Sequence, residues 1–318
     1  MKVYVKTPAR LHLGLIDLNG DLGRLFGGFG VAIDQPNVVL ETEKSSTLRV
    51  IGEKEELTCK YANRFLDAYK ISEKVTINVK QVIPDHIGLG SGTQLALAVA
   101  ASIARLFDVK GSAQEFAVAL GRTAQSGVGT AVFAQGGLVV DAGKNIRDLS
   151  KKEIPVISRM PFPEEWRFIV AIPKTAKGLA NEAEASAFRQ LPSMPPCEIG
   201  KICRLTMLEL LPAISERDIK SFGNALTEIQ RIVGDAFAAA QGGRYSSSPS
   251  AQCIEFMLEE GVYGAGQSSW GPTVYGVIKS HEANMVQTKV QAFLDGNVKG
   301  AVFIAKANNQ GATIKEFQ

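Results

Sequence analysis

The chain has 318 residues, of which 45% are hydrophobic and 21% charged, and this length favours two domains over one. Its net charge of +3, from 35 basic and 32 acidic residues without a basic stripe, excludes a nucleic-acid-binding protein. The longest apolar run, residues 95–107, is shorter than the ~20 residues that span a bilayer, and the N-terminus does not resemble a signal peptide. We therefore expect a cytoplasmic protein with no nucleic-acid or membrane partner.

The four cysteines predict reduced thiols and no structural zinc site, because none of them form a CxxC pair. They are Cys59, Cys197, Cys203 and Cys253.

The first half alternates in a way that predicts strands first and helices later. The expected strands are residues 3–6, 12–17, 38–43, 47–51, 75–79 and 136–140. The expected helices are residues 55–69, 91–107 and 113–120. Residues 20–30 are expected to form a glycine-rich loop.

A segment rich in proline and charge, residues 148–165, predicts the boundary between domains 1–158 and 159–318. After it, strands are expected at residues 167–172, 273–278 and 301–305, and helices at residues 199–211, 219–240, 251–260 and 282–294. Residues 241–250 are expected to form a flexible polar loop. The mixed order indicates an α+β architecture.

The segment GLGSGTQ, from Gly88 to Gln94, predicts a phosphate site. Its three glycines permit close approach of the backbone, and a helix begins at once, so that unpaired N–H groups face the loop. The segment is neither a Walker loop nor a dinucleotide-binding fingerprint. The alternative is a turn that only closes a helix onto a sheet.

Three segments in order resemble the GHMP superfamily of small-molecule kinases. They are ARLHLG at residues 9–14, GLGSG at residues 88–92 and GAGQSS at residues 264–269. The resemblance implies an N-terminal domain like ribosomal protein S5 domain 2 and a ferredoxin-like C-terminal domain. In the sugar and mevalonate kinases a motif SGxDNA supplies an aspartate beside the acceptor hydroxyl, but here Gly129 occupies that position. Glycine cannot accept a proton, which weakens the kinase interpretation.

Longer segments resemble a branch of this superfamily that is not a kinase, the β-ribofuranosylaminobenzene 5′-phosphate synthases. These are residues 9–33, 88–94 and 266–276. The resemblance implies condensation of phosphoribosyl pyrophosphate with 4-aminobenzoate or 4-hydroxybenzoate, release of CO2 and pyrophosphate, and a place in methanopterin biosynthesis. It also implies a homodimer. The choice between the two acids stays open.

Such a reaction needs a cradle for pyrophosphate, Mg2+ and cations for the other anions. We expect pyrophosphate at the glycine loop, through Gly88, Gly90, Ser91, Gly92, Thr93 and Gln94. Asp17 is expected to bind Mg2+ or support the ribosyl cation, and Arg24 to clamp a phosphate or carboxylate. The alternatives are a turn-capping aspartate and a solvated arginine.

Further candidates come from both halves of the chain. Arg10 and His12 share one strand face, where Arg10 would bind an anion and His12 the 4-amino or 4-hydroxyl group. The second loop contributes Gln267, Ser268, Ser269 and Trp270, with Trp270 stacking on the aromatic acid or anchoring the core. Lys174 and Lys177 would add positive potential.

Two other functions share the same fold and loop. One is an ATP-dependent small-molecule kinase of the GHMP type. The other is a non-catalytic sensor of phosphorylated metabolites, for which the aspartate missing at Gly129 is the support.

Overall fold

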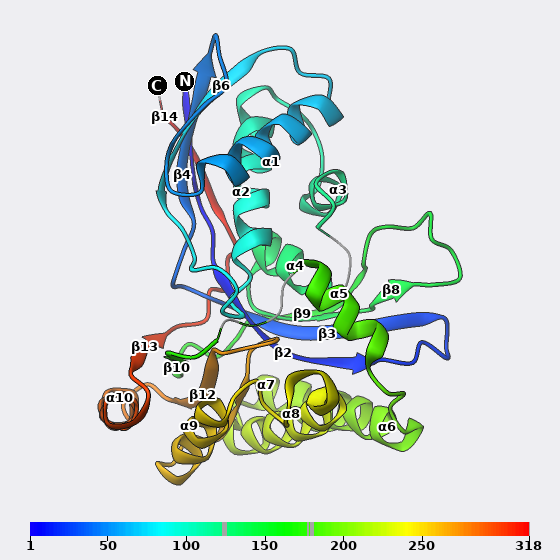
Figure 1. Ribbon diagram of the computed structural model, residues 1–318, viewed down its shortest axis with the longest axis vertical. Helices are drawn as coiled ribbons and strands as arrows, with labels where there is room; N and C mark the ends of the chain where they lie inside the picture. Colours follow the sequence, from blue (N-terminus) through cyan, green and yellow to red (C-terminus); the bar gives the residue numbers. More distant parts are fainter. Residues whose placement is uncertain (123–125, 177, 179–180, 318) are drawn as a thin grey trace.

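The first sheet of the computed structural model, which describes residues 1–122, 126–176, 178 and 181–317, joins both ends of the chain. Its strand order is β14-β1-β4-β6-β5, with all pairs antiparallel except β5 and β6. The bounds are β1 (Lys2–Lys6), β4 (Val39–Ser45), β5 (Arg49–Gly52), β6 (Lys74–Gln81) and β14 (Thr313–Phe317). Figure 1 shows helices α1 (Glu55–Ala68), α2 (Ser91–Leu106) and α3 (Ala113–Ala119) on one side of this sheet.

The second sheet crosses the middle of the molecule (Figure 1). It contains β2 (Ala9–Asp17), β3 (Arg24–Ile33), β7 (Leu138–Asp141) and β9 (Val156–Met160), and β8 (Lys144–Asn145) pairs with β3. Helix α4 (Val128–Gln135) packs on β3 and β7, and helix α8 (Ile219–Gln241) packs on β2. The sheet therefore lies between the helices of the two halves of the chain.

Strand β3 corrects the expectation of a glycine-rich loop at residues 20–30. Only the first residues of this segment, up to Gly23, form a turn, and β3 then continues through Gly28 and Gly30. A Cβ on Gly30 would come within 2.7 Å of Val128 Cγ1. These glycines allow other parts of the chain to approach closely, which is one of the uses of glycine inside a strand.

The third sheet has the order β11-β12-β10-β13 and is antiparallel throughout. Its strands are β10 (Trp166–Pro173), β11 (Gly264–Gln267), β12 (Val274–Lys279) and β13 (Gly300–Ala305). In β10, Phe168 and Val170 join the core cluster that contains α8 residues, whereas Ile169 and Ala171 join the cluster under α9 (Ser248–Glu259) and α10 (Ala283–Asn297). Because both faces are covered, β10 is nearly continuous in apolar residues.

Several elements differ from the sequence predictions. The helix expected at residues 199–211 is longer, since α6 (Pro196–Leu205), a π-helical turn η1 (Thr206–Leu210) and α7 (Leu211–Glu216) follow one another. Helices α4 and α5 (Asn181–Gln190) were not expected. Residues 241–250 are not a flexible loop throughout, because Ser247 caps α9 and the Ser246 N–H donates to Gln267 Oε1.

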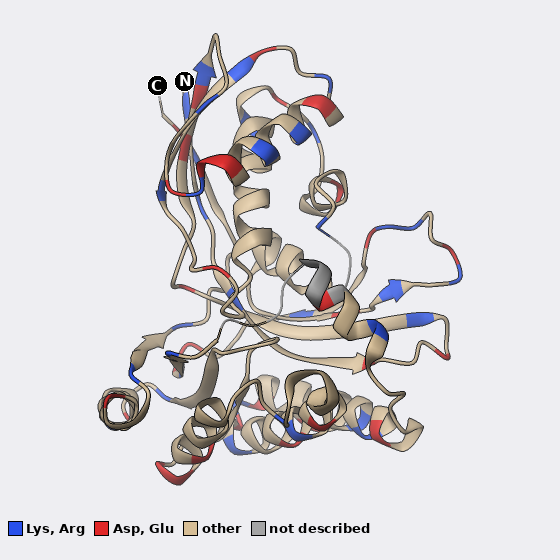
Figure 2. Ribbon diagram, in the orientation of Figure 1, with Lys and Arg blue, Asp and Glu red and all other residues tan. Residues whose placement is uncertain are grey.

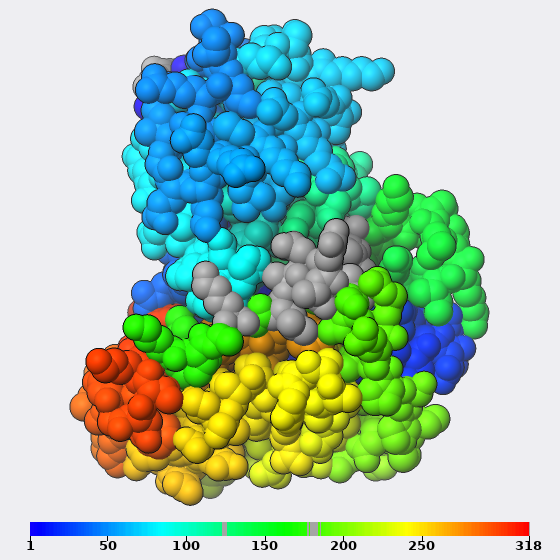
Figure 3. Space-filling model, in the orientation of Figure 1, coloured from blue at the N-terminus to red at the C-terminus, as the bar shows by residue number. Residues whose placement is uncertain are grey.

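The segment expected to link two domains contains β9, which pairs with β7. A division between residues 158 and 159 would fall within this strand, and β14 returns from the other end of the chain to β1. The division remains a prediction. In Figure 3 the blue and cyan N-terminal segments form an upper lobe, and the yellow to red C-terminal segments form a lower one.

Charge of both signs is spread over the two lobes, as Figure 2 shows. Within the described ranges, no helix combines the length and the apolar character needed to cross a bilayer.

Candidate active site

A cavity of about 460 Å³ lies where the two halves of the chain meet. Its walls come from β2, the first turn of α2, the segment before α4, helices α5 and α8, and the loop that follows β11. One end is cationic and one wall is aromatic, so the cavity offers both kinds of surface to a single ligand.

The cationic end contains Arg10 and Arg122. Arg10 donates from Nη1 to the Gly88 carbonyl at 2.6 Å, and Arg122 donates from Nη2 to Thr93 Oγ1 at 3.3 Å. Burial lowers the pKa of Arg10 to about 10, so the side chain stays charged at neutral pH. The Nε atom of Arg122 is buried without a hydrogen-bond partner among the described residues. The two guanidinium groups place positive charge on the cavity wall, which favours an anionic ligand.

The glycine loop brings the start of α2 to this end. Gly90 has the left-handed conformation at the N-cap and offers no side-chain cap. The first helical bond runs from Gln94 N–H to the Gly90 carbonyl, so the amides of the preceding turn are left for a ligand or solvent. Gly88 has a φ of +86°, and a Cβ there would overlap the Ser268 carbonyl oxygen. Only glycine permits this close approach between the two loops.

The aromatic wall consists of Phe188, Phe237 and Trp270. Their ring centroids lie 4.7–5.7 Å apart in edge-to-face pairs. Trp270 Nε1 donates to Glu184 Oε1 at 3.1 Å. Burial raises the pKa of Glu184, whereas the Trp270 hydrogen bond and the charges of Arg10 and Arg122 lower it.

His12 also lines the cavity, close enough to Arg10 to feel its charge. Its Nε2 is 3.2 Å from Ser126 Oγ. Burial and the charge of Arg10 lower the pKa of His12 to about 3, so the ring is neutral at neutral pH. It can therefore both donate and accept hydrogen bonds.

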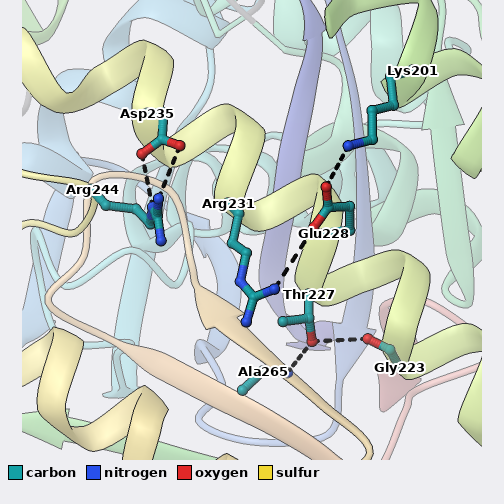
Figure 4. A network of polar contacts seen from close by, with 8 residues as sticks. All are labelled: Lys201, Gly223, Thr227, Glu228, Arg231, Asp235, Arg244 and Ala265. Atoms are coloured by element: carbon teal, nitrogen blue, oxygen red, sulfur yellow. Dashed lines mark hydrogen bonds and ion pairs between the residues drawn. The ribbon is translucent and has the colours of Figure 1, made fainter.

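Arg244 also lines the cavity and is held by Asp235 of α8. Nε donates to Oδ1 at 2.8 Å and Nη2 to Oδ2 at 3.0 Å, as Figure 4 shows. Gly234 makes room for it, since a Cβ there would come 2.6 Å from Arg244 Cγ. In the same view Glu228 pairs with Lys201 and Arg231, farther along α8.

Known proteins resemble the chain over its whole length. The family models "GHMP kinases N terminal domain" and "GHMP kinases C terminal" match residues 56–137 and 210–296. A β-ribofuranosylphenol 5′-phosphate synthase of Methanothermobacter thermautotrophicus is 33% identical, over 98% of this chain and 98% of that protein. Its counterpart in Archaeoglobus fulgidus is 32% identical over 98% and 99%.

The chain belongs to the β-ribofuranosylphenol 5′-phosphate synthase family of the GHMP superfamily. Solved structures of this superfamily share its fold. A homoserine kinase from Cytophaga hutchinsonii has a TM-score of 0.71 at 16% identity, covering 99% of this chain and 97% of its own. A Lactococcus lactis galactokinase has a TM-score of 0.72 at 13% identity, covering 98% and 95%.

In this synthase-family chain, Gly129 lines the cavity, where the SGxDNA motif of the kinases would place an aspartate. A Cβ on Gly129 would lie 3.2 Å from Thr93 Cγ2. The glycine therefore keeps the wall beside Thr93 open, and no carboxylate is present at that position.

The structure brings together most of the candidates expected from the sequence. Arg10, His12, Thr93, Gln267, Ser269 and Trp270 line the cavity. Of the remaining loop residues, Ser268 is buried and donates to the Gly88 carbonyl at 2.6 Å. Gln94 points elsewhere: its buried amide donates to the Gly129 carbonyl at 2.8 Å and ties α2 to α4. Gly88, Gly90, Ser91 and Gly92 shape the loop but do not line the cavity.

Asp17 and Arg24 do not line the cavity. Asp17 Oδ1 accepts the N–H groups of Asn19 and Gly20 at 2.7 and 3.0 Å, which is the turn-capping alternative. Arg24 Nε donates to the Ala142 carbonyl at 2.7 Å. The predictions for Asp17 and Arg24 assumed that both residues flank a glycine-rich loop. In the structure Arg24 is instead the first residue of strand β3. Lys177 lies outside the described residues.

Other cavity residues were missed by sequence reasoning. They are Arg122, Glu184, Phe188, Phe237 and Arg244. None belongs to a glycine motif, and Glu184 and Phe188 stand on a helix that was not expected. The one available signal was Arg122, which lies two residues after the helix expected at residues 113–120.

Proposed function

We propose that the protein condenses phosphoribosyl pyrophosphate with a 4-substituted benzoate and releases CO2 and pyrophosphate, as a step of methanopterin biosynthesis. The proposal rests on one observation above all: a pair of partly buried arginines and an aromatic wall share one cavity. The first suits pyrophosphate and the second suits the benzoate ring. The names of the archaeal relatives specify a phenol product, which favours 4-hydroxybenzoate as the acceptor.

The chemistry divides into one bond broken at the ribose and two changes at the ring. The anomeric C–O bond breaks, and its electron pair leaves with pyrophosphate while positive charge develops on the ribose. The ring carbon that bears the carboxylate then forms the new C–C bond. The bond to the carboxylate breaks, CO2 leaves, and the electron pair restores the aromatic ring. No proton is removed from carbon, so no aspartate is needed at Gly129.

We assign the ends of the substrates by charge. Arg10, Arg122 and the first turn of α2 would hold pyrophosphate, because guanidinium groups and helix N-termini both favour it. Arg244, with two of its three nitrogens fixed by Asp235, would bind the 5-phosphate. Trp270, Phe188 and Phe237 would cover the benzoate ring.

We propose that Mg2+ enters the cavity bound to the pyrophosphate group of the substrate. Mg2+ prefers oxygen ligands and often combines one carboxylate with substrate phosphates. Among the described residues that line the cavity, Glu184 is the one carboxylate, and the described part of the chain contains no group of three or more metal-binding side chains. Glu184 therefore replaces Asp17 as our candidate ligand. Bound there, Mg2+ would neutralise charge on the leaving group.

The family resemblance is also our reason to propose a cytoplasmic homodimer. Sedimentation equilibrium of the purified protein tests the assembly: a monomer at micromolar concentration would contradict it.

The activity is tested by release of labelled CO2 from carboxyl-labelled 4-hydroxybenzoate and 4-aminobenzoate. Each acid is supplied with phosphoribosyl pyrophosphate and Mg2+, and a parallel tube holds ATP instead. We expect labelled CO2 only with phosphoribosyl pyrophosphate, and faster from the hydroxy acid. No CO2 from either acid would overturn the proposal. ADP formation in the ATP tube, screened against small alcohols, would then indicate a kinase.

A further inference from the structure

A line of three polar side chains leads from the cavity into the protein interior. His12 comes from β2, Ser126 from the segment before α4, and Asp141 from the end of β7. His12 Nε2 lies 3.2 Å from Ser126 Oγ, and Ser126 Oγ lies 3.1 Å from Asp141 Oδ2. His12 is 7% exposed and Asp141 is fully buried, while Ser126 between them is partly buried and lines the cavity.

Asp141 is surrounded by donors. Its Oδ1 accepts the N–H groups of Gly28 and Gly143 at 3.1 and 2.8 Å. Its Oδ2 accepts the Gly127 N–H at 2.9 Å together with the Ser126 hydroxyl. Three of its four donors are backbone N–H groups, which cannot accept a proton, so the arrangement fits the ionised form. Burial raises the pKa of Asp141 above its ordinary value, although these four hydrogen bonds act in the opposite direction.

The Ser126 hydroxyl has one proton to give, and the ionised Asp141 is the stronger acceptor. Ser126 Oγ also accepts the Val128 N–H at 3.1 Å. Its remaining lone pair therefore faces His12 Nε2, which must donate. The neutral ring then carries its proton on Nε2, and Nδ1 has a free lone pair. Nδ1 has no hydrogen-bond partner among the described residues, and the ring lines the cavity, so a ligand can supply one.

We propose that Asp141 and Ser126 fix His12 as the Nε2–H tautomer, so that Nδ1 accepts a hydrogen bond from the 4-hydroxyl or 4-amino group of the acceptor. His12 would be a catalytic residue, and Ser126 and Asp141 positioning residues. The charged groups around the cavity near the ring are Arg10, Arg122 and Glu184.

The consequence for the reaction rests on the proposed function. When the ring carbon attacks the ribose, positive charge reaches the 4-substituent, and its proton shifts toward Nδ1. The proton returns when CO2 leaves and the ring regains its aromatic electrons. No proton is gained or lost overall. A ring with the opposite tautomer would present a donor to a donor, and this assistance would disappear.

The tautomer itself can be measured without substrate. The chain has only three histidines, so 15N-labelled histidine gives few signals, and His86→Gln and His281→Gln assign the other two. We expect the His12 ring at pH 7 to show a protonated Nε2 and an unprotonated Nδ1, and the tautomers to mix in Ser126→Ala. A protonated Nδ1, a mixture or a charged ring in the unaltered protein would overturn the proposal.

Kinetics test the link to catalysis. We expect Ser126→Ala to lower kcat about 10- to 100-fold with little change in KM for phosphoribosyl pyrophosphate. Ser126→Thr keeps the hydroxyl and should recover most of the loss, which a purely structural role in folding would not require. An unchanged kcat in Ser126→Ala would overturn the catalytic role. If the unaltered protein released no CO2, the proposed function would fail, while the tautomer measurement would still stand or fall by itself.

Discussion

Arg122 illustrates what a single residue contributes to the cavity. Its guanidinium donates from Nη2 to Thr93 Oγ1, and the side chain lines the cavity beside Arg10. A fixed guanidinium can bind phosphate oxygens through two parallel hydrogen bonds. Arg122 is therefore our main candidate for recognition of the anionic substrate.

Arg122→Lys should raise KM for phosphoribosyl pyrophosphate about tenfold or more, because an ammonium group cannot reproduce the planar fork of the guanidinium. Steady-state CO2 release measures the effect. Arg217→Lys is a matched control, since the Arg217 side chain is 71% exposed and pairs with Glu165 at the surface. Equal KM values for the two variants would contradict the assignment of the cationic end.

Glu184→Gln should raise the Mg2+ concentration needed for half-maximal activity about tenfold, because the amide is a weaker ligand than the carboxylate. Titration of activity with Mg2+ at saturating substrate measures this. The amide can still accept the Trp270 hydrogen bond, so the aromatic wall should stay in place. An unchanged Mg2+ requirement would remove Glu184 as a ligand.

At the scale of elements, β2 organises the site. Its alternation places Arg10 and His12 toward the cavity, as expected from the sequence. A register shift between His12 and Gly14 then changes the pairing with β3, and Gly14 and Leu15 both reach the cavity. A bulge of this kind re-aims side chains beside active sites. One strand thus supplies polar and apolar lining.

Ser268 links three elements, since it donates to the Gly88 carbonyl at 2.6 Å and accepts the His12 N–H at 2.9 Å. Ser268→Ala should destabilise the protein by about 1–3 kcal/mol, because the buried His12 N–H would lose its acceptor, while the Gly88 carbonyl would keep the hydrogen bond from Arg10. Chemical denaturation measures this, with the exposed Ser72→Ala as the control. A loss as small as that of the control would mean that the loops are held by other contacts.

At the scale of the whole molecule, the end of the chain fastens the two halves together. The Asn308 N–H donates to the Ala32 carbonyl, the Gly137 N–H donates to the Asn308 carbonyl, and the Ala312 N–H donates to the Phe133 carbonyl, at 2.7–2.8 Å. Strand β14 then joins the first sheet. The N-terminal half therefore depends on residues from the far end of the sequence.

Chains that end at Lys306 and at Ala312 both lack the edge strand β14, but only the shorter one also loses the hydrogen bonds of residues 308 and 312. The chain that ends at Lys306 should therefore melt several degrees lower. Thermal denaturation followed by circular dichroism compares the two. Equal melting temperatures would show that residues 307–312 add nothing beyond β14.

Stability should also depend on pH through His12. Its pKa in the folded state, about 3, lies below the ordinary value of about 6.5. Above pH 6.5 the ring is neutral in both the folded and the unfolded state, so it does not affect stability. Below pH 6.5 the unfolded state binds a proton that the folded state does not, and stability falls by up to about 1.4 kcal/mol per pH unit until the pH reaches about 3. His12→Gln should remove this slope in urea denaturation between pH 6.5 and 4. Identical slopes would exclude His12 as its source.

Elements with a local periodicity could be predicted from the sequence. Residues 75, 77 and 79 are buried in β6 as their alternation predicted, and the glycine loop leads into α2 as its residue types required. The resemblance of three short segments also indicated the superfamily and the branch to which the chain belongs.

The identity of the residues that share the cavity could not be predicted, because it depends on long-range packing. Arg122, Glu184 and Arg244 lie far apart in the sequence and meet because α5, α8 and the loop before α9 fold over β2. Asp17 and Arg24, which belong to the first motif region, instead cap a turn and donate to the carbonyls of residues 142 and 143, respectively. Local patterns report burial and backbone conformation, whereas the direction of a polar side chain depends on partners that only long-range packing supplies.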